Sequence, residues 1–450
     1  MIDRRVFLGG AGAAAASSLL GGLALPGLAA GEDYRALVVV YLNGGNDGNN
    51  TLVPTDAAYN DYQTSRANLA IPRASLAALP GAAAGRTFGL HPALAPLVPI
   101  YTEGRLAFIA NVGPLIEPAT AVRVLANTVR LPPFLMSHSD QTQIVQGWNV
   151  SDDASGWAGR GLEALPAAMR NQVAAITMGG DRTLVLGKAS AVAFMPPGGT
   201  RYWGAADLNQ PQTPYAQAIN GMAKLQFANA YEAEFARTLG NAVSDSTLFT
   251  QAFMAAQSPA GDFGTDNHGN LGNQLKSLAS VLPVFKSMGL KRQVFLITWG
   301  GFDTHTNQRG SDGNTQDAQL AELAKALVAY DAANKANGID ANVVTLTMTE
   351  FGRTLRPGSG GGSEHAWGNH WFAFGGPVAG ANVLGTFPSM VLGGPDDGDN
   401  NKNGRMVPTI SSDQVGASLM QWLGLAPSQL TTVFPHLVNF SNKTIPLLRT

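Results

Sequence analysis

The chain lacks cysteine altogether: none occurs among its 450 residues. This absence excludes disulfide scaffolds, thiolate metal sites, cysteine nucleophiles and iron–sulfur clusters. Sulfatases that depend on an oxidised cysteine are excluded by the same count.

Charge is also scarce, since only 13% of the residues are charged, with 29 Lys+Arg against 31 Asp+Glu. No Lys/Arg-rich run is present, which argues against a nucleic-acid partner and against a polybasic membrane-surface protein. The hydrophobic fraction of 45% excludes a disordered chain and is enough for one large α/β domain or two ordinary ones.

The N-terminus carries the features of a targeting signal. Arg4 and Arg5 precede a Gly/Ala/Leu-rich run that ends near Pro26, with small residues before Gly31. This pattern is typical of a twin-arginine signal peptide, which we assign to residues 1–30. A membrane anchor is the alternative, but Gly and Ala dominate where a stable span prefers Leu, Ile and Val. We expect a periplasmic or secreted protein with no membrane span in the mature chain.

From residue 35 onward, apolar runs alternate with polar loops and helical patterns. Apolar runs without alternation are typical of central strands in a parallel sheet. The predicted strands are 36–42, 106–112, 174–178, 293–298 and 342–348, and the clearest helices are 275–288 and 316–335. The alternation predicts a doubly wound α/β fold with a mostly parallel sheet flanked by helices.

One stretch breaks this rhythm. Residues 189–261 are rich in Gln, Asn and Ala and largely helical in pattern. We interpret them as a helical cap insertion within a single domain that spans residues 31–450.

In doubly wound sheets, functional residues lie in the loops after the strands. Asp303 and His305 follow the strand at 293–298, and this pair can face one hard-to-borderline cation. Glu350 follows the strand at 342–348 and can serve as a metal ligand or in acid/base work, while the Arg353 guanidinium can hold an oxyanion. The alternatives are surface turns and a Glu350–Arg353 pair that closes the loop.

Two further loops carry ligand-type residues. Asp47 lies in the Gly/Asn-rich loop after the first strand, where a simple turn is the alternative. His365 and His370 lie beside the glycines at 360–362, whose backbone can approach a ligand closely. A lone histidine is usually structural, but several in such loops favour a site.

The segment Ser137-His138-Ser139-Asp140 enters a helix predicted from Gln141. Ser and Asp at a helix start are ordinary N-caps. The functional alternative is a nucleophilic Ser137 or Ser139 at a helix N-terminus, with His138 moving protons and Asp140 beside it.

Taken together and in this order, these loops resemble the bacterial secreted family known as domain of unknown function 1501. The resemblance covers almost the whole mature chain. The stretches that carry it are Leu42-Asn43-Gly44-Gly45-Asn46-Asp47-Gly48, Ser137-His138-Ser139-Asp140, Gly301-Phe302-Asp303-Thr304-His305, Glu350-Phe351-Gly352-Arg353 and Glu364-His365-Ala366-Trp367-Gly368-Asn369-His370.

That family is grouped with the alkaline-phosphatase and sulfatase superfamily, so the resemblance implies an alkaline-phosphatase-like sheet with divalent metal ions at its strand ends. Asp303 and His305 would stand near one metal ion, with His365 or His370 completing the site. Phe351 stands where the superfamily places a histidine after its carboxylate, here Glu350. Asn43 replaces the first-strand aspartate, with Asp47 as its substitute.

The leading hypothesis is an exported hydrolase of phosphate or sulfate esters, small or polymeric, that depends on zinc, manganese or calcium. The second is a non-catalytic envelope or extracellular binding or assembly protein on the same fold, with a protein partner. An exported redox enzyme is a weaker third, because no cofactor fingerprint is present.

Overall fold

The computed structural model describes residues 33–81, 85–147, 154–199, 202–203, 206–207, 212–265 and 270–449. The predicted signal peptide, residues 1–30, lies outside these ranges. In the part of the chain that is described, no helix combines the length and the hydropathy needed to cross a bilayer.

A central sheet organises the molecule, and nine strands of it fall within the described ranges. Its order is β15-β5-β14-β11-β1-β10-β6-β7, with β16 also paired to β5. All neighbours run parallel except β14, which is antiparallel to both β11 and β5. The mostly parallel sheet predicted from the sequence is confirmed. The strands are β1 (Arg35–Leu42), β5 (Leu106–Gly113), β6 (Ala175–Thr177), β7 (Ala193–Phe194), β10 (Arg292–Trp299), β11 (Val343–Met348), β14 (Asn369–Phe374), β15 (Asn382–Leu384) and β16 (Ile410–Ser411).

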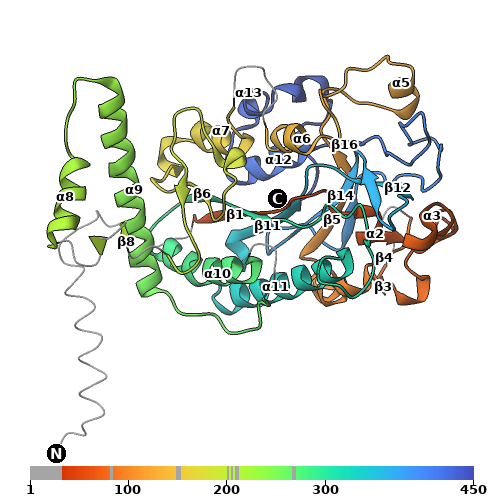
Figure 1. Cartoon of the computed structure of the whole chain (residues 1–450), viewed down its shortest axis with the longest axis horizontal. Helices are drawn as coiled ribbons and strands as arrows, with labels where there is room; N and C mark the ends of the chain where they lie inside the picture. The colour runs from red at the N-terminus through yellow and green to blue at the C-terminus, as the bar shows by residue number, and fades with distance from the viewer. Residues whose placement is uncertain are drawn as a thin grey trace, which may run out of the picture.

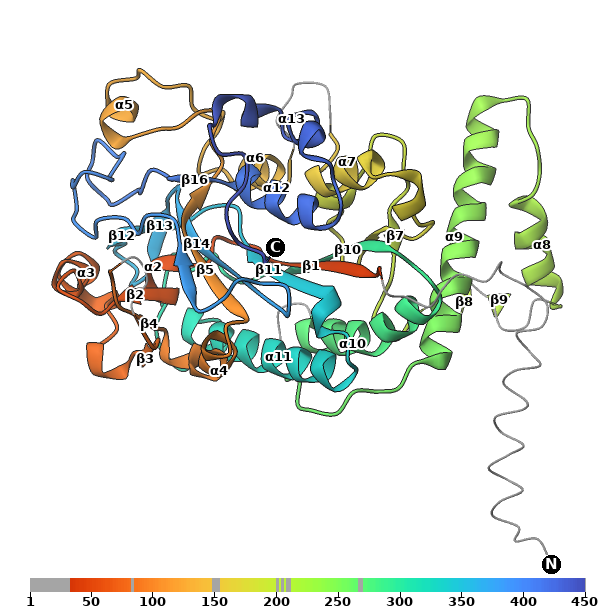
Figure 2. The same ribbon diagram turned by 180° about the vertical axis from the view of Figure 1, so that it is seen from behind.

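The sheet divides the apolar interior into two cores, as strand β1 demonstrates. Ala36, Val38 and Val40 face one core, while Leu37 and Val39 face the other. Successive side chains of a strand point to opposite faces, so a strand buried on both faces must be apolar throughout. Figures 1 and 2 show helices α10 (Leu271–Ser287) and α11 (Gln316–Ala336) on one face and α7 (Trp157–Ala164), α12 (Ser412–Trp422) and α13 (Leu430–Val433) on the other.

Shorter elements lie in the connections between the strands of the central sheet. The helix predicted from Gln141 begins earlier, at His138, with Ser137 as its N-cap. These shorter elements are α2 (Gly48–Thr51), α3 (Tyr59–Arg66), α4 (Val98–Thr102), α5 (Ala121–Leu125), α6 (His138–Val145), β2 (Leu52–Pro54), β3 (Ala77–Ala78), β4 (Phe88–Leu90), β12 (Arg353–Pro357) and β13 (Ser363–His365).

The segment at 189–261 contains a helical hairpin, α8 (Pro214–Met222) and α9 (Ala230–Ala255), and the two-residue strands β8 (Tyr202–Trp203) and β9 (Ala206–Asp207). Figures 1 and 2 place the hairpin at one end of the molecule and the β12–β13 pair at the other. The hairpin therefore does not cover the loops that carry the predicted site residues.

Candidate metal centre

Three loops interlock where the parallel strands β1, β10 and β11 end. Gly44, after β1, has φ +116°, and a Cβ there would lie 2.4 Å from the backbone nitrogen of Asp303, after β10. The Gly44 N–H also donates to Oε1 of Glu350, after β11, at 2.8 Å. A glycine is thus needed at position 44, because only its backbone can approach the neighbouring loop this closely.

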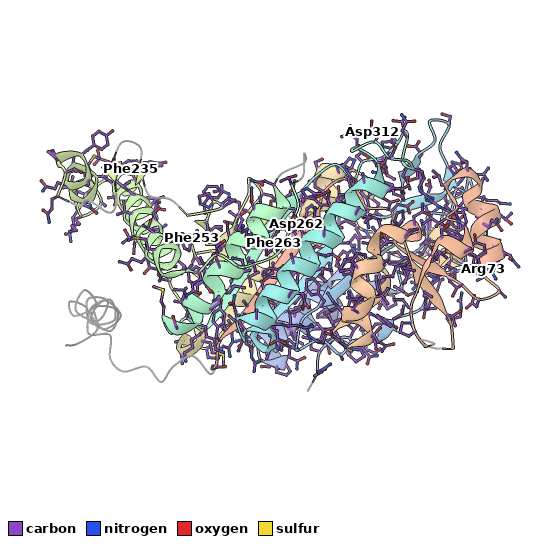
Figure 3. The ribbon with its side chains drawn as sticks, turned by 90° about the horizontal axis from the view of Figure 1, so that it is seen from below. Arg73, Phe235, Phe253, Asp262, Phe263 and Asp312 are labelled. Atoms are coloured by element: carbon purple, nitrogen blue, oxygen red, sulfur yellow. The ribbon has the colours of Figure 1, made fainter. Side chains whose placement is uncertain are left out.

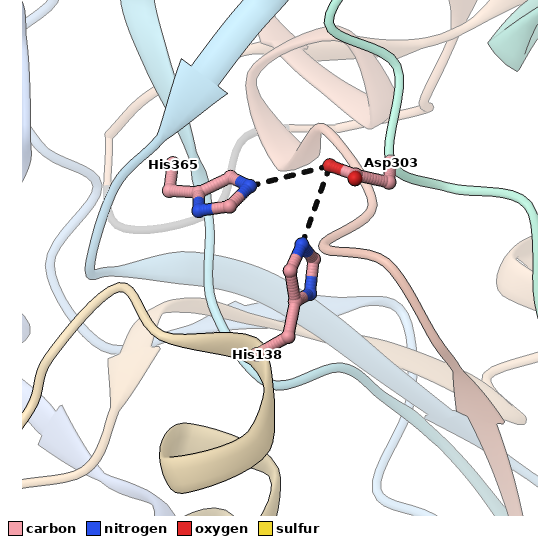
Figure 4. Close-up of side chains that lie close together, drawn as sticks. All are labelled: His138, Asp303 and His365. Atoms are coloured by element: carbon pink, nitrogen blue, oxygen red, sulfur yellow. Dashed lines mark hydrogen bonds and ion pairs between the residues drawn. The ribbon is translucent and has the colours of Figure 1, made fainter.

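Asp303 lies at the centre of a cluster of imidazole rings. Its Oδ1 lies 3.1 Å from Nε2 of His305, 3.2 Å from Nε2 of His365 and 3.4 Å from Nε2 of His138. His138 comes from the first residue of α6, and His365 from the end of β13. Figure 4 shows His138 and His365 directed at the same carboxylate oxygen. Residues far apart in sequence thus bring three imidazole nitrogens within 3.4 Å of one carboxylate oxygen, and His138, Asp303 and His365 form a group whose ligand atoms lie within 4.8 Å of one another.

The other ring nitrogen of each histidine is held by an acceptor. Nδ1 of His138 lies 2.9 Å from the Glu350 carboxylate, and Nδ1 of His305 lies 2.8 Å from that of Glu364. Nδ1 of His365 lies 2.8 Å from the Met136 carbonyl. An acceptor at Nδ1 keeps the proton there, which leaves the Nε2 lone pair free to bind a metal.

Packing fixes the ring positions. The Phe351 ring centroid lies 4.7 Å from that of His138 and 4.5 Å from that of His365. The resemblance to the alkaline-phosphatase and sulfatase superfamily had placed Phe351 at a position where a histidine was expected. Here Phe351 packs against the two ring faces, and His138 supplies a ring nitrogen from a different element.

Two observations test whether these residues fit a cation. Nε2 of His138 is buried and has no hydrogen-bond partner among the described residues. Nε2 of His305 and Nε2 of His365 lie 2.9 Å apart, so that in neutral rings two lone pairs face each other. A cation bound in the cluster would give the His138 nitrogen a partner and would lie between the two facing lone pairs of His305 and His365. Ligand atoms in a tetrahedral zinc site with bonds of about 2.0–2.1 Å lie about 3.3 Å apart, close to the separations here.

The charges agree with a cation site. Burial raises the pKa of Asp303, but the hydrogen bond and charge of Arg353 outweigh it and lower that pKa to about 2. The carboxylate is therefore ionised at neutral pH. The hydrogen bond that His138 donates to Glu350 raises the pKa of His138, while burial lowers the pKa of His365.

Arg353 has a different set of contacts from those expected. Its buried guanidinium donates to the carbonyls of Gly45 at 2.8 Å and Ser363 at 2.9 Å, to the Gly44 carbonyl, and to Asp303 at 2.6 Å. These contacts occupy the guanidinium inside the protein. They favour a role in orienting Asp303 and do not support the predicted role as the holder of a substrate oxyanion.

Asp47 and His370 are not among the clustered ligand atoms found in the described residues. Asp47 is buried, caps α2 and forms an ion pair with Arg66. His370 was expected in a loop but lies in β14, the antiparallel strand that the sequence analysis did not predict. Its Nδ1 accepts the N–H of Asn111 at 3.0 Å.

The two serines beside His138 are directed elsewhere. Ser137 Oγ donates to Asp140 at 2.5 Å, and Ser139 Oγ donates to the same carboxylate at 3.2 Å. The ring nitrogens of His138 face Glu350 and Asp303 instead. Ser137 occupies the N-cap position of α6, as the helix-capping alternative predicts, but its side chain makes no capping hydrogen bond.

The sequence analysis missed two contributors. Glu364 stands next to His365 in a stretch already singled out, so its carboxyl group was a visible signal. Met136 acts through its backbone carbonyl, for which no side-chain signal exists. Glu364 holds Nδ1 of His305, and the Met136 carbonyl holds Nδ1 of His365.

The fold and the cluster define an α/β protein with a histidine–carboxylate site at the carboxyl ends of its parallel strands. The chain belongs to the family described as Protein of unknown function (DUF1501), whose model matches residues 34–393. No curated protein sequence matches it.

The solved structures with a similar course of the chain have low sequence identity to this protein. The zinc complex of the C-terminal periplasmic domain of EcEptC from Escherichia coli is 11% identical, with a TM-score of 0.30, and the match covers 88% of this chain and 84% of that one. The lipoteichoic acid synthase LtaP from Listeria monocytogenes is 9% identical, with a TM-score of 0.33 and coverages of 88% and 74%. The phosphonate monoester hydrolase SpPMH from Silicibacter pomeroyi is 9% identical, with a TM-score of 0.30 and coverages of 88% and 74%. At this distance, none of the three bears on the reaction.

Proposed function

We propose that the protein is an exported, metal-dependent hydrolase of phosphate or sulfate esters. The observation that carries the proposal is the convergence of imidazole Nε2 atoms on the Asp303 carboxylate, each ring being fixed by an acceptor at Nδ1. Such carboxylate–histidine pairs are the usual surroundings of a bound metal ion. The absence of cysteine fits a site built from nitrogen and oxygen alone.

His138, Asp303 and His365 would hold the metal, since their ligand atoms lie within 4.8 Å of one another. Two histidines and one carboxylate leave a coordination position open, as in catalytic zinc sites. A divalent ion there supplies Lewis acidity toward an ester oxygen and activates water. Zinc is the ion we favour, because the donor set is rich in nitrogen.

His305 would then serve as the proton-transfer residue. Glu364 holds its Nδ1 at 2.8 Å, so its Nε2 can accept a proton at the cluster. Because Arg353 binds Asp303 and the surrounding carbonyls, it would position the carboxylate and would not touch the substrate. Neither Ser137 nor Ser139 is given the role of nucleophile, because both hydroxyls are bound to Asp140.

One observation favours a second function. His305 Nε2 lies as close to Asp303 as His365 Nε2 does, at 3.1 Å and 3.2 Å. If His305 were also a ligand, four protein ligands would close a tetrahedral sphere, which is typical of structural zinc. The protein would then be a metal-stabilised binding or assembly protein without hydrolase activity.

The experiment is to purify the mature protein without chelator, measure zinc, manganese and calcium by elemental analysis, and assay p-nitrophenyl phosphate and p-nitrophenyl sulfate. We expect one metal ion per chain and hydrolysis of one ester that EDTA abolishes. The His305→Ala variant should keep the metal and lose turnover. Asp262→Asn, at an exposed carboxylate paired with Lys325, is the matched control and should behave as wild type.

The two functions give different results. Loss of metal in His305→Ala, with neither ester cleaved by the wild type, would favour the structural centre. A well-folded wild type without stoichiometric metal would contradict both.

A further inference from the structure

The free end of the α8–α9 hairpin is apolar and exposed. The residues from 224 to 235 are all exposed. Figures 1 and 2 show this end projecting away from the body, and Figure 3 shows Phe235 near its tip, well away from Phe253 and Phe263. The large apolar side chains here, called the hairpin tip, are Met222 (42% exposed), Leu225 (54%), Phe227 (38%), Tyr231 (88%) and Phe235 (63%).

The two halves of α9 differ in what they bury. The C-terminal half reaches the main core, where the Phe249 ring centroid lies 6.1 Å from that of Phe285. The N-terminal half contributes only Ala236, Leu239 and Val243 as buried apolar residues, and none of them belongs to either core. The tip thus exposes more large apolar side chains than it buries, although helical hairpins are stabilised mainly by packing of an apolar face.

We propose that the hairpin tip is a self-association surface, at which α8 and α9 of two copies pack into a four-helix bundle about a two-fold axis. Pairs of helical hairpins complete such bundles readily, and a two-fold interface brings the same patch of each copy together. Because the tip projects, two copies can meet there while their bodies remain apart.

The tip offers a substantial part of the area that a dimer needs. Aromatic side chains bury about 150–250 Å² each when fully covered, and those of the tip are already partly covered, so they offer on the order of 400 Å² to a partner. Specific interfaces bury about 800 Å² per partner, and the polar residues between the aromatics would supply the rest. Tyr, Phe and Met are also the residue types enriched at protein interfaces.

The charges favour a second copy over a lipid surface. Between residues 222 and 237 the sequence carries Lys224 and Arg237 against Glu232 and Glu234, so both signs occur in equal number. Tyr231 and Phe235 stand four residues apart and so lie on one face of α9. Binding to an anionic membrane would require an excess of Lys and Arg around the aromatic residues. In a two-fold dimer, by contrast, the acidic groups of one copy can pair with the basic groups of the other.

Light scattering coupled to size-exclusion chromatography tests the proposal at micromolar concentrations of the mature protein. We expect a dimer for wild type and a monomer for Tyr231→Glu and Phe235→Glu, with association weakened by at least about 100-fold. Met254→Glu is the matched control, because Met254 is 74% exposed on the same helix but lies at its other end. That variant should stay dimeric, and circular dichroism should be unchanged in all three.

Because the chain contains no cysteine, a single introduced thiol is an unambiguous probe. Phe235→Cys should give a covalent dimer on mild oxidation and Met254→Cys should not. A wild-type monomer at all micromolar concentrations would overturn the proposal. So would a monomer that binds phosphatidylcholine–phosphatidylglycerol vesicles through Phe235. Metal content and ester hydrolysis should be the same in Phe235→Glu and wild type, so this test is independent of the proposed function.

Discussion

Asp47 and Asp303 make an instructive pair, since both follow a parallel strand and both were predicted to bind metal. Asp47 is fully buried and is bound by Arg66, by the Gln308 side chain at 2.6 Å and by the Asn49 N–H at 3.0 Å. Asp303 is 46% exposed and is surrounded by imidazole nitrogens with lone pairs to share. The neighbours of Asp47 are all donors, which satisfy a carboxylate, whereas Asp303 has one donor, Arg353, and three imidazole nitrogens whose lone pairs a cation could bind.

The partners of a carboxylate therefore distinguish a structural group from a ligand better than its place at a strand end does. A buried charge surrounded by donors is already neutralised, and a metal ion would have to displace them. Four expected effects would break or sharpen this comparison.

The largest effect should be on bound metal. Asp303→Ala is expected to remove stoichiometric metal from the purified protein, because the central oxygen ligand is lost. Asp47→Asn should keep one metal ion per folded chain, and elemental analysis compares the two. Equal metal content in both variants would contradict the assignment of Asp303.

The second effect is on stability and should fall on Asp47. Asp47→Asn leaves the fully buried Arg66 guanidinium without its counter-charge, and breaking a buried pair costs about 3–5 kcal/mol. Urea unfolding of the metal-free protein should register this loss. Asp303→Ala also removes the carboxylate partner of a buried arginine, Arg353, but should cost less, because Asp303 itself is 46% exposed and water can reach the place it leaves. The reverse order would show that Asp303 is the structural group.

The third effect depends on pH and concerns His370. Burial lowers the pKa of His370 to about 4, from an ordinary value of 6.5. The neutral ring therefore stabilises the fold fully above about pH 6.5, and this contribution is lost as the pH falls toward 4. The 2.5-unit difference corresponds to about 3 kcal/mol.

His370→Asn tests this pH dependence, because Asn Oδ1 can accept the Asn111 N–H in place of Nδ1 without titrating. The free energy of unfolding, measured from pH 7 to pH 4, should fall less steeply in the variant than in wild type. Parallel curves would mean that His370 does not contribute to acid lability.

The smallest effect should come from the acceptors behind the histidines. Glu350→Gln and Glu364→Gln keep the size of the side chain and remove its charge. Loss of such a partner typically weakens metal binding by about 10- to 100-fold. Competition with a zinc chelator measures the change. Unaltered affinity in both variants would show that the histidines do not depend on these carboxylates.

The sheet was predictable because its strands carry their signal locally. An apolar run such as 293–298 is buried on both faces wherever its neighbours lie, and the structure extends it only to Arg292–Trp299. Asp303, His305, His365 and Glu350 could be singled out because they stand directly after strands or in glycine-rich loops, and the structure brings them close together.

The misplaced residues depend on long-range pairing. His370 was expected in a loop because Trp367 to His370 shows no clear strand pattern, yet β14 forms between β11 and β5 and buries that ring. His138 was predicted as a proton shuttle, since nothing in its segment reveals that α6 points it toward Asp303. The partner of Asp47 is Arg66, a residue of α3 that no motif includes.

The position of β1 has a consequence for the order in which the chain acquires its structure. Both sheet neighbours of this strand come from much later in the chain: Arg35 pairs with Arg292, and Ala36 with Val343. An apolar strand must then wait, unpaired, until most of the protein has left the ribosome. Contacts this remote in sequence make folding slow, and unpaired strands are prone to aggregate. Until β10 and β11 have been synthesised, β1 is therefore a segment through which this chain can aggregate.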